Sequence, residues 1–258
     1  MPRSKIVEHT NIMNLKYIVI SIAIWLFVAI TWIILFPFFF VLWFVTFPFD
    51  SRKVLTRKYT SLWGRLYLCI NPKWKILITG KEKINRSKPR VVIANHQSMI
   101  DIFILYDVYP YYAWVSKKEN YYVPILGWVM YLNNYIMVDR KNPLSFPKMF
   151  ADCARELKKG GSVIIFPEGT RSPNGELGRF KEGAFKVAID NKVPIIPIVF
   201  DGTYKLLLKK GKTSKSKKEV HIHVLDEVPY EKFPFYEPVQ LKEYFKNIMA
   251  EELRKIRG

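Results

Sequence analysis

Residues 91–101 have the sequence VVIANHQSMID, in which an unbroken apolar run, Val91–Ala94, leads directly into polar residues. Such a run predicts a strand that is buried on both faces of a sheet. His96 follows the run, and Asp101 lies five positions later, about one turn into a helix that we expect to begin near Ser98. A carboxylate there can hold the imidazole in one tautomer, so that its other nitrogen can take a proton from a hydroxyl. A histidine near an aspartate is more often a structural hydrogen bond, so a catalytic role depends on what lies nearby.

Three other apolar runs also end in polar residues. Arg140 follows residues 135–138, the turn Glu168–Arg171 follows residues 162–166, and Gly202 follows residues 194–200. Helical segments separate these runs, which predicts an α/β fold with a largely parallel sheet flanked by helices. The carboxyl ends of parallel strands meet at one edge of a sheet, where ligands bind in open α/β folds. We therefore expect the four polar clusters to converge there.

The remaining elements complete this pattern. Three further strands are predicted at residues 74–79, 113–116 and 219–225. Five helices are predicted at residues 98–109, 124–133, 145–158, 181–190 and 238–257. The helix at 145–158 should stop at Gly160-Gly161, since glycine commonly ends a helix. No linker marks a second globular domain.

The N-terminal part of the chain is strongly apolar. Residues 17–49 contain no charged residue, a stretch too long for the core of a signal peptide. Pro37 is expected to break or kink this segment. Basic residues flank it on both sides, and the positive-inside rule would keep both flanks in the cytoplasm. We expect a kinked or re-entrant helical hairpin, while a single span with its N-terminus outside is the alternative.

Residues 51–71 predict a second, amphipathic helix. Its apolar residues recur at helical spacing, and its basic residues, such as Arg57 and Lys58, occupy the other faces. A basic amphipathic helix rich in aromatic residues suits a membrane interface. The alternative, an ordinary helix packed on the globular part, is compatible with that role.

The formal net charge of +19 indicates an anionic partner, either nucleic acid or a membrane face with an anionic substrate. The apolar N-terminal segment favours the membrane, and no nucleic-acid-binding motif is present. Cys69 and Cys153 lie far apart and predict neither a disulfide framework nor a metal site. This cysteine usage fits a reducing compartment, so we expect the globular part to lie in the cytoplasm.

The turn after residue 166 is suited to a phosphate. Gly169 permits close approach of the backbone, and Arg171 offers a planar fork of donors that matches phosphate oxygens. Glu168 is expected to orient Arg171 or to accept a hydrogen bond from a substrate hydroxyl. Lys117 and Lys118 add positive charge near the same edge. The alternative for such a turn is a surface ion pair without function.

Four ordered blocks of the chain resemble the 1-acylglycerol-3-phosphate acyltransferase family of the bacterial type. The first is Asn95-His96 with Asp101. The second combines Lys117-Lys118-Glu119, Pro124, Gly127 and Val138-Asp139-Arg140. The third is Phe166-Pro167-Glu168-Gly169-Thr170-Arg171-Ser172, and the fourth is residues 193–198, VPIIPI. The resemblance covers roughly residues 74–225, and Asp201 departs from the small polar residues frequent at that place in the family.

The resemblance implies a membrane-anchoring segment at residues 1–71 and an α/β acyltransferase domain at residues 72–258. His96 and Asp101 would be catalytic, and His96 would deprotonate the sn-2 hydroxyl of lysophosphatidate. The phosphate would bind Lys117, Lys118, Arg140 and the turn Glu168, Gly169, Thr170 and Arg171. Asn95, Ser98 and Pro197 would shape the acceptor or acyl pocket.

The same resemblance implies an acyl-CoA or acyl-carrier-protein donor, no metal and no other cofactor, and a place on the cytoplasmic face of the inner membrane. Two alternatives remain: the same chemistry on another acceptor, such as glycerol 3-phosphate, or a non-catalytic protein that binds anionic lipid. His221 and His223 are interpreted as a plain strand face. The lysine-rich segment 205–218 is by default a solvated loop, and a contact with anionic lipid or carrier protein is its sharper interpretation.

Overall fold

The computed structural model describes residues 3–71, 74–84, 88–109, 111–206 and 218–258, with the side chains of the first helix described for Val19 and from Ser21 onward. Most of the lysine-rich segment lies outside these residues, so its contact with lipid or carrier protein stays a prediction.

A seven-stranded sheet in the order β1-β7-β6-β2-β5-β3-β4 forms the centre of the fold. Neighbouring strands are parallel except β6 and β7, which pair antiparallel, so β7 and β1 run opposite to the other five strands. The predicted α/β class with a largely parallel sheet is confirmed. The strands are β1 (Trp74–Thr79), β2 (Val91–Ala94), β3 (Tyr112–Lys117), β4 (Ile136–Val138), β5 (Ser162–Ile165), β6 (Ile195–Asp201) and β7 (Lys218–Val224).

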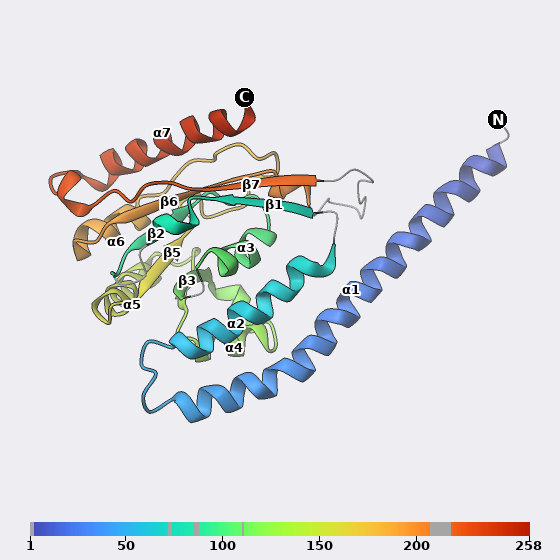
Figure 1. Cartoon of the computed structure of the whole chain (residues 1–258), viewed down its shortest axis with the longest axis horizontal. Helices are drawn as coiled ribbons and strands as arrows, with labels where there is room; N and C mark the ends of the chain where they lie inside the picture. Colours follow the sequence, from blue (N-terminus) through green and yellow to red (C-terminus); the bar gives the residue numbers. More distant parts are fainter. Residues whose placement is uncertain (1–2, 72–73, 85–87, 110, 207–217) are drawn as a thin grey trace.

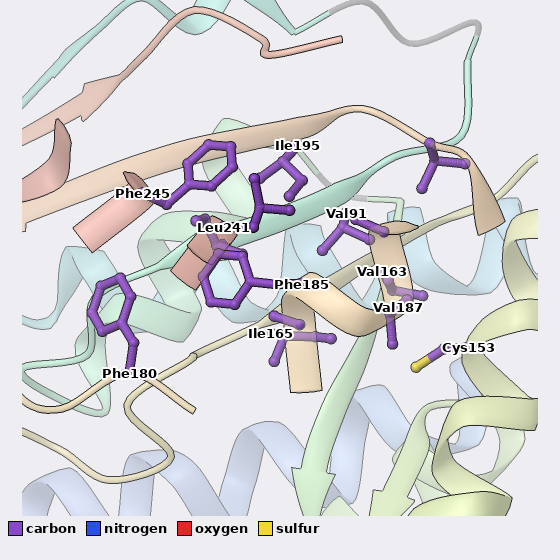
Figure 2. Packing of buried hydrophobic residues seen from close by; sticks show 14 of the residues in the cluster. Val91, Cys153, Val163, Ile165, Phe180, Phe185, Val187, Ile195, Leu241 and Phe245 are labelled. Carbon is purple, nitrogen blue, oxygen red and sulfur yellow. The ribbon is translucent and has the colours of Figure 1, made fainter. Parts of the chain in front are cut away.

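Helices cover both faces of the sheet, because each central strand is apolar on both sides. In β2, Val91 and Ile93 face one core, and Val92 and Ala94 face the other. The first core is filled by α5, α6 and α7, including Phe185 and Phe245 of the last two (Figure 2). The second core is filled mainly by α3. The helices of the domain are α3 (Ile100–Val108), α4 (Leu126–Leu132), α5 (Phe146–Lys158), α6 (Gly183–Asn191) and α7 (Pro238–Arg257).

The N-terminal helix α1 (Arg3–Thr46) is continuous, and its first turns extend away from the rest of the chain (Figure 1). The break expected at Pro37 is wrong: the helix passes through this proline and ends at Thr46, two residues before Pro48. A proline removes one backbone hydrogen bond, which a long helix can tolerate. The chain instead turns after Thr46, so the hairpin consists of α1 and α2 (Val54–Leu66). Its placement in a bilayer stays a prediction.

Residues Ser21–Thr46 are long and apolar enough to cross a membrane, and most of their side chains are exposed. Trp25 and Ile33, for example, are each 70% exposed. The end of α1 packs on α2 and α4 through a small cluster that includes Phe39, Trp63 and Val129. The hairpin therefore contacts the globular part, while most of its apolar surface faces outward.

The helix α2 does not simply bury its apolar residues and expose its basic ones, as its sequence pattern predicts. Thr56, Arg57 and Ser61 are buried, whereas Leu55 and Leu62 are exposed. The Arg57 guanidinium forms an ion pair with Glu156 of α5, and the Ser61 hydroxyl donates to the Tyr106 carbonyl of α3. Arg57 is thus not part of a solvent-facing basic surface, because α5 supplies a buried carboxylate for it. The packed face of α2 therefore combines small and polar residues with the apolar Trp63.

Candidate functional site

The site begins at the loop between β2 and α3, where Asp101 gathers the preceding residues around itself. Its side chain is fully buried in the first turn of α3. One carboxylate oxygen, Oδ2, lies 2.8 Å from His96 Nδ1 and accepts from the backbone N–H groups of Gln97 (2.7 Å) and Ser98 (2.8 Å). Because a carboxylate only accepts hydrogen bonds, Nδ1 of His96 carries the proton and Nε2 is free to accept one. The predicted His96–Asp101 contact is therefore present.

Two further contacts hold His96, one at its ring and one at its backbone. The Phe166 ring at the end of β5 stacks on it, with ring centroids 4.0 Å apart and planes 18° from parallel. The backbone N–H of His96 donates to Glu168 Oε1 at 3.0 Å. The His96 side chain is 13% exposed, so a substrate can reach it while most of its surface stays covered. This is the arrangement expected of an oriented general base.

Glu168 holds the turn after β5 to the loop after β2. Its second oxygen, Oε2, accepts from the Gly178 backbone N–H at 2.9 Å, and the residue is 6% exposed. Burial raises the pKa of Glu168, and its hydrogen bonds from His96 and Gly178 oppose that shift. Within the described residues no hydrogen bond or ion pair joins Glu168 to Arg171, and the observed role of Glu168 is this cross-link between the two loops.

Cationic side chains gather at the turn that contains Gly169. The backbone carbonyl of Gly169 accepts from Arg140, which follows β4, so the structure brings together two of the predicted clusters. Lys181 is also close, since its Nζ lies 3.3 Å from where a Cβ on Gly169 would be. Gly169 has φ +69°, a conformation that side chains rarely adopt. Arg171 is exposed beside this turn, and its charge is thus available to an anion.

No sequence pattern indicates Lys181, because no motif or spacing connects it to a turn twelve residues earlier. The predicted residues Lys117 and Lys118 lie at the end of β3, next to the end of β4. Lys118 pairs with Asp139 at 3.4 Å, and Lys117 is exposed. Both are at the same edge as Arg140, but their contact with a phosphate stays a prediction.

Three residues expected to line an acceptor or acyl pocket are buried instead. The amide of Asn95 bonds the backbone N–H and carbonyl of Phe200, at 2.7 and 2.9 Å, and so joins β2 to β6. The Ser98 hydroxyl accepts from the Ile100 backbone N–H at 3.3 Å. Pro197 lies within β6, opposite Ile93. The structure shows that Asn95 and Ser98 hold the backbone around the end of β2, and the role of the three residues in an acceptor or acyl pocket stays a prediction.

The comparisons with known proteins agree with this geometry. An acyltransferase family model matches residues 75–201, the stretch from β1 to the end of β6. This stretch is 127 of the 258 residues, and it is the part of the chain that resembles the acyltransferase family. All the predicted site residues lie in this acyltransferase domain, whereas α1, α2 and α7 lie outside it. The resemblance stated from the sequence is confirmed.

Several relatives are named as 1-acyl-sn-glycerol-3-phosphate acyltransferases. The chloroplastic enzyme of Arabidopsis thaliana is 39% identical over 58% of this chain and 43% of its own length. A Chlamydomonas reinhardtii protein is 36% identical over 65% of this chain and 50% of its own. A Pseudomonas aeruginosa protein is 39% identical over 47% of each. The chain thus spans about half the length of these relatives.

A solved structure shares the fold beyond the acyltransferase domain. The 1-acyl-sn-glycerophosphate (LPA) acyltransferase PlsC of Thermotoga maritima superposes with a TM-score of 0.75 at 24% identity. The match covers 95% of this chain and 98% of that one, so it includes most of the N-terminal hairpin. At this identity the likeness shows the fold alone.

Proposed function

We propose that the protein is a membrane-bound acyltransferase that moves an acyl chain from an acyl thioester to the sn-2 hydroxyl of 1-acylglycerol 3-phosphate, giving phosphatidic acid. The observation that carries the proposal is the His96–Asp101 hydrogen bond of 2.8 Å, which leaves Nε2 of a partly exposed imidazole free to accept a proton. The names of the relatives support the acceptor.

In the proposed reaction, His96 Nε2 takes the proton of the sn-2 hydroxyl while the oxygen attacks the thioester carbonyl carbon. The tetrahedral intermediate then collapses, the carbon–sulfur bond breaks, and the imidazolium gives its proton to the departing thiolate. Asp101 stabilises the imidazolium between these steps and holds the ring with Nε2 outward. The reaction needs only the two substrates, and acyl-CoA and acyl-carrier protein both supply the thioester.

The phosphate of the acceptor would bind at the cationic turn. Arg171 and Arg140 would offer guanidinium donors at the turn of Gly169, and Lys181 would add an ammonium group. Two guanidinium groups suit a phosphate, since each can donate two parallel hydrogen bonds. Glu168 would act on the protein side only, by holding this turn against the backbone of His96. Lys117 and Lys118 remain proposed partners at the rim.

The α1–α2 hairpin would place this site at a bilayer. The helix α2 packs on α3, whose first turn contains Asp101, and the Phe103 ring of α3 contacts Tyr67 directly after α2. Tyr67 in turn contacts Phe27 of α1. A short chain of aromatic contacts therefore joins the exposed apolar helix to the element that holds the base. We propose the cytoplasmic membrane as the location, with the acyltransferase domain on the cytoplasmic side.

An acceptor-by-donor activity screen in detergent or liposomes tests the proposal. The wild-type chain should acylate lysophosphatidate, while His96→Ala should lose turnover and still bind liposomes. His221→Ala is the matched control, because that histidine lies on β7 with Glu219 as its neighbour. Arg171→Ala should raise the KM for the phosphate-bearing acceptor and leave the donor KM unchanged.

Each possible outcome is informative. Turnover with glycerol 3-phosphate or another lysophospholipid, but not with lysophosphatidate, would keep the chemistry and change the acceptor. Wild-type rates in both His96→Ala and Asp101→Asn would refute the dyad. Liposome binding without turnover of any donor–acceptor pair would favour a non-catalytic lipid-binding protein.

A further inference from the structure

The last turn of α7 holds an arginine that reaches back to the sheet edge. The guanidinium of Arg257 donates to Asp201 Oδ1 from Nε (3.0 Å) and from Nη2 (2.9 Å). It also donates to the Gly175 carbonyl (2.8 Å) and to Glu176 Oε1 (2.7 Å). One side chain from outside the acyltransferase domain thus contacts the end of β6 and the loop after the cationic turn.

That loop, residues 172–178, is bonded to the backbone around the proposed base. The Ser172 backbone N–H donates to the His96 carbonyl at 2.7 Å. The Gly178 backbone N–H donates to Glu168, whose other oxygen accepts from the His96 backbone N–H. The backbone of His96 is therefore linked to both ends of the 172–178 loop. Its carbonyl accepts directly from Ser172, and its N–H is linked to Gly178 through the Glu168 carboxylate.

The middle of the loop reaches the same place by another route. The Gly175 carbonyl, which accepts from Arg257, also accepts from Gln97 Nε2 at 3.1 Å, and Gln97 is the residue after His96. Tyr204 packs closely on Gly175, since a Cβ there would lie 2.4 Å from its ring. Arg257 and Gln97 thus bond the same carbonyl, which joins the 172–178 loop to the chain beside the base.

The charges favour this contact over an incidental surface pair. Asp201 is the departure from the family pattern noted in the sequence, and its side chain is only 12% exposed. Arg257 is 32% exposed and faces two carboxylates, Asp201 and Glu176. Hydrogen bonds from an arginine fork to a carboxylate combine charge with fixed geometry. By contrast, the neighbouring Lys255–Glu251 pair is a solvated contact within one helix, with both side chains at least 60% exposed.

We propose that Arg257 is a positioning residue for the acyl transfer. Its hydrogen bond to the Gly175 carbonyl fixes the position of the 172–178 loop, and that loop in turn fixes the position of His96. The inference rests on the proposed function. Arg257 touches neither His96 nor the cationic turn, so its loss should lower kcat and leave the KM for lysophosphatidate within about twofold. A misplacement of about 1 Å at a reacting group can reduce the rate by about 100-fold, so we expect kcat to fall by about 10- to 100-fold.

The experiment compares Arg257→Ala with Arg254→Ala, which removes an exposed arginine from the same turn of α7. Steady-state kinetics are measured on the full chain in detergent, with the wild type first. Arg257→Lys should restore only part of the rate, because an ammonium group cannot bond Asp201 and Gly175 in the same planar geometry. Millimolar guanidinium ion should raise the rate of Arg257→Ala and leave Arg254→Ala unchanged.

A merely structural contact would give a different result. It would lower the unfolding temperature of Arg257→Ala without the selective loss of kcat or the rescue by guanidinium. Equal rates for Arg257→Ala and Arg254→Ala, with an active wild type, would overturn the inference and leave the proposed function intact. An inactive wild type would instead refute the proposed function.

If Arg257→Ala does not fold, Asp201→Ala provides the test, since it removes the acceptor of two of the Arg257 hydrogen bonds. The inference then requires a lower kcat with an unchanged acceptor KM, and wild-type kinetics in Asp201→Ala would overturn it.

Discussion

Truncation of Glu156 should destabilise the fold far more than replacement of the whole Arg57–Glu156 pair. The two side chains are 1% and 8% exposed and join α2 to α5. Glu156→Ala leaves the Arg57 guanidinium buried with only the Asn133 and Tyr111 carbonyls as acceptors. Breaking a buried pair from one side costs about 3–5 kcal/mol. Because two carbonyls remain, we expect a loss of about 3 kcal/mol in the free energy of unfolding.

The double variant Arg57→Met with Glu156→Leu removes both charges and keeps much of the volume. It should be as stable as the wild type, or more stable by about 1–4 kcal/mol, because neither charge then has to be desolvated. Lys148→Ala is the control: it breaks the exposed Lys148–Asp152 pair on α5 and should cost less than about 0.5 kcal/mol.

Urea unfolding in detergent, followed by tryptophan fluorescence, measures all these variants. A loss below about 1 kcal/mol for Glu156→Ala would mean that water reaches Arg57 and would refute the assignment of a buried, dry pair. A double variant as unstable as Glu156→Ala would show that shape, and not charge, makes this contact.

Three further predictions follow from single contacts. Phe166→Ala removes the ring stacked on His96 and should lower kcat by about tenfold with unchanged liposome binding, as measured by steady-state kinetics and flotation. Burial raises the pKa of Glu168, so its contribution to stability is complete below the ordinary value of 4.5 and is lost as the pH rises through the raised value. Unfolding midpoints of the wild type should therefore fall over that range relative to Glu168→Gln, and parallel pH curves for the two proteins would contradict this. Gly161→Ala places a Cβ 2.1 Å from Glu156 Oε1, so it should displace the buried carboxylate and cost about as much as Glu156→Ala in the same urea assay.

The sheet could be predicted from the sequence because each central strand is an apolar run with a sharp polar end. Residues 74–79 were predicted as a strand and match β1, and the predicted strand at 135–138 contains β4. The antiparallel placement of β7 beside β6 could not be predicted. It depends on which edge of a finished sheet is free, and strand composition does not encode this. The course of α1 through Pro37 was missed for a related reason: a proline lowers helix stability locally, and the rest of a long helix compensates.

In the site, too, some contacts could be predicted from the sequence and others could not. The His96–Asp101 hydrogen bond spans five residues, so strand and helix geometry bring the groups together. The bond from the His96 backbone to Glu168 spans 72 residues and uses a main-chain donor, which no residue pattern reveals. Lys181 and Arg257 were missed because their partners are backbone carbonyls or distant loops. Spacing therefore predicted the dyad, and only the fold shows what holds it.

The two faces of α2 differ from those of an ordinary amphipathic helix in water. Periodicity predicts that a helix has an apolar face and a polar face, and in water the apolar face packs inward. In α2 the small and polar residues Thr56, Thr60 and Ser61 are buried together with Trp63, while Leu55 and Leu62 are exposed together with Lys58 and Arg65. The inward polar groups are satisfied by hydrogen bonds such as Ser61 to Tyr106, and an outward face that mixes leucine with lysine and arginine suits a membrane interface. This mixed face agrees with the proposed location at a bilayer and adds to the apolar composition of α1, because composition alone also fits a core helix or a signal sequence.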